Sequence, residues 1–84
     1  MSAALIKELA SMYALAVATA DFGVPNGHLY ALTAMPMGVD LDGHNLAVRV
    51  LKNGGLIAEE ASLLTWTGSE DLRLRLKRAI GRKS

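Results

Sequence analysis

The chain has 84 residues, a formal net charge of +1, no cysteine, 51% hydrophobic residues and a mean hydropathy of +0.26. This length allows one small domain over residues 1–84. The low charge and high apolar content exclude a disordered tail, and the lack of cysteine excludes a disulfide scaffold. So much apolar surface in so short a chain predicts either a densely filled core or an apolar face kept for a partner.

Two helices are predicted in the first part of the chain. Residues 2–20 carry apolar side chains at helical spacing on nearly every side, with Ser2 as the N-cap. A turn then leads to Asn26, which we expect to cap a second helix over residues 27–35. The residues expected to face inward on this second helix are Leu29, Leu32 and Met35.

A third helix is predicted over residues 41–53. Asp40 is a suitable N-cap, and Gly54 and Gly55 form a strong helix stop because glycine adopts the left-handed C-cap conformation without strain. The side chains expected to face the core are Leu41, His44, Val48 and Leu51. We interpret His44 as a hydrogen-bonded histidine of the core rather than as a ligand or a base.

A short β-hairpin over residues 56–66 and a last helix over residues 68–80 complete the pattern. The hairpin tip is expected at residues 59–62. Thr67 and Glu70 have the spacing of a capping box, which predicts that they start the last helix together. The order predicts a mainly α (α+β) fold: three helices, a two-stranded wing and a C-terminal helix.

This order is that of a winged helix-turn-helix domain, and two local motifs resemble such proteins. Residues 51–57 (LKNGGLI) are similar to the junction between recognition helix and wing in many bacterial winged-helix proteins. Residues 64–68 (LTWTG) resemble the L-T-W-x-G motif of a family of small bacterial and prophage proteins of unknown function. That family continues with His, any residue, Phe and Leu, of which this chain keeps Leu72. The resemblance, over roughly residues 40–72, implies a winged helix, a fold that serves both DNA and protein partners.

No motif for catalysis, a cofactor or a metal is found in the sequence. His28 and His44 are expected on different helices, and no cysteine accompanies them, which disfavours a zinc site. The run that begins at Asp40 lacks the glycine and the glutamate that an EF-hand requires. We therefore predict that the protein is not an enzyme and binds neither metal nor cofactor. For Trp66 we favour packing over the helices rather than stacking on a ligand.

The charge is unevenly distributed along the chain. Residues 1–48 carry one lysine against four acidic residues, whereas residues 49–84 carry eight basic residues against four acidic ones. On a winged helix, the third helix would enter the major groove and the C-terminus would reach phosphates. The candidate DNA-binding residues are Asn45, Arg49, Lys52, Arg82 and Lys83.

Acidic residues occupy places that DNA-binding winged helices keep basic. Glu59 and Glu60 lie at the expected wing tip, and Asp40 and Asp42 lie at the start of the expected recognition helix. These positions would repel phosphates, so a protein partner is the main alternative to DNA.

The apolar first helix predicts self-association. Leu74 adds an apolar residue on the basic side of the last helix, and twofold pairing is the commonest closed symmetry. The candidate partner or dimer interface residues are Leu5, Leu9, Met12, Tyr13 and Leu74.

Two functions therefore remain open. The first is a small winged-helix DNA-binding regulator acting as a homodimer. The alternative is a phage or prophage accessory module that docks on a host protein complex, for example an inhibitor of a host defence system such as an anti-CRISPR protein. Because the longest apolar stretch, residues 9–20, is too short to span a bilayer, we expect a cytoplasmic protein without membrane contact.

Overall fold

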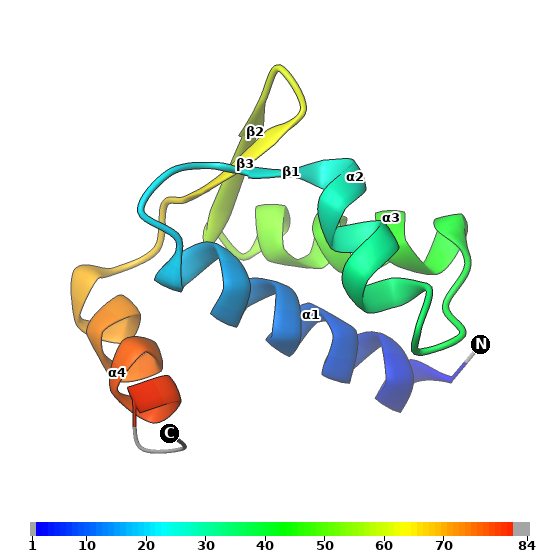
Figure 1. Cartoon of the computed structure of the whole chain (residues 1–84), viewed down its shortest axis with the longest axis horizontal. Helices are drawn as coiled ribbons and strands as arrows, with labels where there is room; N and C mark the ends of the chain where they lie inside the picture. Colours follow the sequence, from blue (N-terminus) through cyan, green and yellow to red (C-terminus); the bar gives the residue numbers. More distant parts are fainter. Residues whose placement is uncertain (1, 82–84) are drawn as a thin grey trace.

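The computed structural model describes residues 2–81 and is mainly helical, with a small antiparallel sheet (Figure 1). This is the α+β architecture that was predicted. The helices are α1 (Ala3–Thr19), α2 (Asn26–Leu29), the π-helical turn η1 (Tyr30–Ala34), α3 (Leu41–Asn53) and α4 (Glu70–Gly81). The strands are β1 (Val24–Pro25), β2 (Ile57–Glu60) and β3 (Leu63–Trp66).

Helix α1 packs against α3, α4, η1 and β3. Its backbone starts as predicted, because the Ser2 hydroxyl accepts a hydrogen bond from the Leu5 amide at 3.0 Å. Six of its side chains are buried: Ile6, Leu9, Ala10, Tyr13, Val17 and Ala18. A helix with neighbours on several sides needs apolar residues around most of its circumference, which accounts for the composition of this segment.

The segment between α1 and α2 contains a strand, where only a turn was expected. Val24 and Pro25 pair with Leu64 and Leu63, so the sheet order is β1-β3-β2. Pro25 has no amide hydrogen to donate, but it occupies an edge strand, where proline is tolerated. The sheet therefore has three strands rather than the two predicted.

The second helix differs from the prediction in its cap and in its inward face. Pro25 is the N-cap residue, and its side chain has no group that could form a cap bond. The Asn26 side chain instead donates to Glu59. The wide π-helical turn takes about 4.4 residues instead of 3.6, so the residues after Leu29 rotate away from the expected positions. Ala34 is buried, whereas Leu32 and Met35 are exposed.

Helix α3 has the predicted bounds and the predicted caps. The Asp40 carboxylate accepts a hydrogen bond from the Gly43 amide at 2.9 Å. At the other end Gly55 has a φ of 74°, a conformation in which a residue with a side chain is strained. His44, Val48 and Leu51 are buried as expected, but Leu41 is 54% exposed because it lies in the first turn, beyond the edge of the core.

The hairpin tip is Ala61–Ser62 rather than the four-residue segment predicted, and Glu59 and Glu60 belong to β2. Figure 1 shows the hairpin projecting away from the helices and α4 lying beside the C-terminal end of α1.

The start of α4 also differs from the prediction. The Ser69 hydroxyl, not that of Thr67, accepts a hydrogen bond from the Leu72 amide at 3.1 Å. The Thr67 hydroxyl donates instead to the Gly55 carbonyl, and Glu70 contacts Arg73. The predicted capping box of Thr67 and Glu70 is therefore wrong, because Ser69 caps the first turn of α4 instead.

Candidate functional site

The predicted DNA-binding residues of α3 lie together on its outer surface. Asn45, Arg49 and Lys52 are all exposed and follow helical spacing on the side opposite the core. Arg82 and Lys83 lie outside the described residues, so the structure does not place them beside this stripe.

The positive charge of Lys52 is already paired. Its ammonium group lies 2.5 Å from a carboxylate oxygen of Glu59 on β2. The other carboxylate oxygen of Glu59 accepts a hydrogen bond from the side-chain amide of Asn26 at 2.9 Å. These two hydrogen bonds lower the pKa of Glu59, which keeps this hairpin carboxylate ionised. Two of the charges beside α3 therefore cancel one another.

A buried hydrogen-bond chain continues inward from the Lys52–Glu59 ion pair through Asn26. His44 is 1% exposed, with the Tyr13 hydroxyl 2.5 Å from its Nδ1 and the Asn26 side-chain oxygen on its Nε2. Because that amide oxygen can only accept, Nε2 carries the proton and Nδ1 accepts from Tyr13. The interpretation of His44 as a satisfied core histidine is confirmed.

Burial sets the ionisation of both Tyr13 and His44. Removal from water lowers the pKa of His44, and the nearby Glu59 carboxylate opposes that effect only in part. Burial, with the neighbouring Tyr30 as a smaller cause, raises the pKa of Tyr13 to about 12. Both groups are thus neutral near pH 7, and neither is accessible to a substrate in this conformation.

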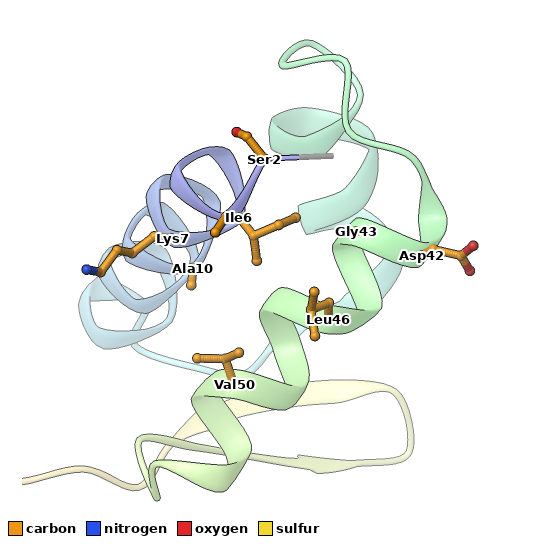
Figure 2. Close-up of a pocket in the computed structure, with 9 residues that line it drawn as sticks. Ser2, Ile6, Lys7, Ala10, Asp42, Gly43, Leu46 and Val50 are labelled. Atoms are coloured by element: carbon orange, nitrogen blue, oxygen red, sulfur yellow. The ribbon is translucent and has the colours of Figure 1, made fainter.

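An apolar groove of about 620 Å³ lies between α1 and α3. Figure 2 shows Ile6, Leu46 and Val50 pointing into it from the two helices. Leu46 is 43% and Val50 is 50% exposed, and both project from α3 along the same side of the groove. The lining residues are Ser2, Ala3, Ile6, Lys7, Ala10, Asp42, Gly43, Leu46 and Val50. We call this surface the α1/α3 groove.

The structure does not bring the predicted interface residues into one surface. Leu9 and Tyr13 are completely buried within the chain, so in this conformation they present no surface to a second copy. Leu5 is half-buried against the core, while Met12 and Leu74 are 43% and 44% exposed. At 100° per residue, Leu5 and Met12 lie on the side of α1 away from the α1/α3 groove.

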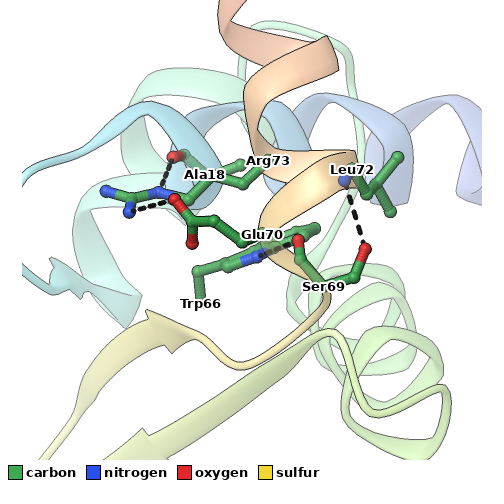
Figure 3. Close-up of polar contacts among 6 residues, drawn as sticks. All are labelled: Ala18, Trp66, Ser69, Glu70, Leu72 and Arg73. Carbon is green, nitrogen blue, oxygen red and sulfur yellow. Dashed lines mark hydrogen bonds and ion pairs between the residues drawn. The ribbon is translucent and has the colours of Figure 1, made fainter.

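A second, smaller hollow of about 360 Å³ lies beside Trp66 at the start of α4. The Trp66 indole donates to the Ser69 carbonyl at 3.2 Å, and Arg73 donates to the Ala18 carbonyl at 2.9 Å (Figure 3). A side chain at Gly68 would fall 2.7 Å from the indole ring, so only glycine fits there. These contacts confirm the packing role of Trp66: it anchors the last helix.

Within residues 2–81 no group of three or more His, Cys, Asp or Glu side chains is close enough to hold a metal ion. No helix in this range is long and apolar enough to cross a membrane.

One feature of the sequence indicates the apolar lining of the α1/α3 groove. Leu46 and Val50 are spaced by four residues, outside the set assigned to the core, and therefore form an apolar stripe of their own. The buried chain of Tyr13, His44 and Asn26 had no such signal, because its members are 31 and 18 residues apart. Comparison of the chain with protein-family models, with curated proteins and with solved structures finds no significant match.

Proposed function

We propose that this chain is a winged-helix domain that acts by binding a protein through the α1/α3 groove. The winged-helix assignment is supported by the order α1, β1, α2, α3, β2, β3 and by the sheet order β1-β3-β2. The motif over residues 64–68 fits the same interpretation, since it ends β3 and leads into α4.

The observation that carries protein binding is the exposed apolar lining of the groove. Aliphatic side chains half exposed beside a concave surface lose unfavourable contact with water when a partner covers them. Helical segments and other apolar protein surfaces bind in grooves of this kind.

The electrostatics of the surrounding surface also favour a protein over a nucleic acid. Lys52 is neutralised by Glu59, and the N-terminal end of α3 carries Asp40 and Asp42. A phosphate backbone would meet these carboxylates at the end of the helix that usually approaches the bases.

Site-specific photo-crosslinking in cells tests this function. A benzoylphenylalanine placed at Val50 is expected to form a protein adduct, whereas the same probe at the exposed Ala58 of β2 is not. A Leu46→Lys substitution should abolish the adduct, because it puts a charge into the groove. Equal adducts from both probe positions, or none from Val50, would show that the groove is not a protein-binding surface.

A second candidate, a DNA-binding regulator, rests on Arg49. It is exposed beside Asn45 and has no acidic partner among the residues that the structure describes. Arginine and asparagine are the side chains that most often contact guanine and adenine edges.

Fluorescence anisotropy with mixed-sequence duplex DNA tests this candidate. If it holds, affinity falls steeply as salt rises, and Arg49→Ala weakens binding by at least about fivefold. Arg75→Ala is the matched control, since Arg75 is already paired with Asp71 on α4. No binding at low salt would eliminate DNA as the partner.

A further inference from the structure

The two sides of the α1/α3 groove differ in how far their apolar side chains protrude. The α3 side presents Leu46 and Val50, which are 43% and 50% exposed, while on the α1 side Ile6 and Ala10 are buried and Ala3 is small. One side therefore supplies ridges and the other supplies a surface against which ridges can lie closely.

The two sides also differ in charge. Lys7 lies on the α1 side and Asp42 on the α3 side, and Figure 2 shows them on opposite flanks of the apolar row. Neither forms an ion pair with any residue of the described range 2–81. The groove thus carries an unpaired positive flank and an unpaired negative flank.

We infer that the partner in the α1/α3 groove is the same groove of a second copy of this chain. A twofold axis that lies in the interface and runs along the groove places α1 of each copy on α3 of the other. Leu46 and Val50 then cover the small residues of the second copy, and Lys7 faces its Asp42. Because the axis is twofold, each of these apolar and charged contacts forms twice in the dimer.

This inference rests on the proposed use of the groove for protein binding and names the partner. It also moves the dimer contact to a different side of α1 from the one predicted around Leu5 and Met12.

Light scattering of the purified full chain tests the oligomeric state. The expected mass is twice the 8.9 kDa of one chain. Val50→Lys is expected to give the mass of one chain with an unchanged helical circular dichroism spectrum, because this side chain is already half exposed. Leu74→Lys is the matched control: its residue is 44% exposed but lies on α4, and the variant should stay dimeric.

Charge reversal tests the orientation of the two copies. Lys7→Glu and Asp42→Lys, each alone, create two like-charge contacts per dimer and should raise the dimer dissociation constant by about tenfold. The double variant restores opposite charges across the interface and should recover the original constant. If both single variants weaken the dimer and the double variant does not recover the original dissociation constant, the proposed orientation is wrong.

The outcomes separate this inference from the function on which it rests. A monomer at all concentrations up to about 500 μM, with a Val50 adduct to a different protein, overturns the dimer and leaves protein binding standing. Dissociation by Leu74→Lys rather than by Val50→Lys also overturns it. Absence of any Val50-specific adduct would overturn both the dimer and the proposed binding of a protein in the groove.

Discussion

The imidazole of His44 accepts one hydrogen bond and donates another, so both of its ring nitrogens have partners inside the core. No buried side-chain nitrogen or oxygen lacks a partner within the described range. A buried polar group costs little when it is fully paired and much when it is not. The stability of the core therefore depends on each member of this hydrogen-bond chain.

Tyr13→Phe is expected to destabilise the protein by about 1–3 kcal/mol. The substitution removes only the hydroxyl and leaves His44 Nδ1 buried without a donor. Urea denaturation followed by circular dichroism measures the change in the free energy of unfolding.

Tyr30→Phe is the matched control for this experiment. Tyr30 also packs edge-on against the His44 ring, with centroids 5.3 Å apart, but its hydroxyl makes no side-chain hydrogen bond in the described range. Its loss should change stability by less than about 0.5 kcal/mol. An equal effect of the two variants would show that the hydrogen bond between Tyr13 and His44 contributes no more than the loss of any hydroxyl at this place.

Stability is also expected to fall as the pH drops below about 6.5, the ordinary pKa of histidine. Burial lowers the pKa of His44 in the folded chain, so between the two pKa values the unfolded chain binds a proton that the folded chain does not. Linkage then makes the free energy of unfolding fall by no more than about 1.4 kcal/mol per pH unit. Urea denaturation between pH 5 and pH 8 measures this slope.

The exposed His28 supplies the control for the pH experiment. His28→Gln should keep the slope, whereas His44→Gln should remove it even if the protein becomes less stable overall. Retention of the slope in His44→Gln would assign it to other groups.

At the scale of the elements, the hairpin turn is strained by its sequence. Ala61 and Ser62 have φ angles of 52° and 67°, a region that side chains disfavour. Two-residue hairpin turns with both φ angles positive prefer Asn-Gly. Ala61→Asn with Ser62→Gly should therefore stabilise the protein by about 1 kcal/mol, as measured by the thermal midpoint. Ala58→Gly, within β2, is the control and should destabilise it instead.

Element positions could be predicted wherever one local signal dominated. Asp40 and the Gly54–Gly55 pair fixed both ends of α3, because capping chemistry is local. Local reasoning failed where a side chain had a more distant partner. Asn26 is a good cap in isolation, but its amide is engaged by His44 and Glu59, which are 18 and 33 residues away.

At the scale of the whole molecule, composition indicated surplus apolar surface but not its place. Periodicity assigned that surplus to α1, yet α1 packs against α3, α4, η1 and β3, and Leu9 and Tyr13 are completely buried. The exposed large apolar side chains are spread over several elements, with Met12 on α1, Phe22 before β1, Leu32 on η1, and Leu46 and Val50 on α3. A helical wheel shows which side is apolar, but only the arrangement of neighbours shows which apolar side is covered.

The hydrogen-bond chain from Tyr13 through His44, Asn26 and Glu59 to Lys52 also governs how the molecule unfolds. It joins α1, α3, α2 and β2, so it exists only when the helices and the hairpin are in place together. If the hairpin detaches, Asn26 loses Glu59 and the core histidine loses its support. The helical part and the sheet should therefore melt in one cooperative transition, with tryptophan fluorescence from β3 and helical circular dichroism giving the same midpoint.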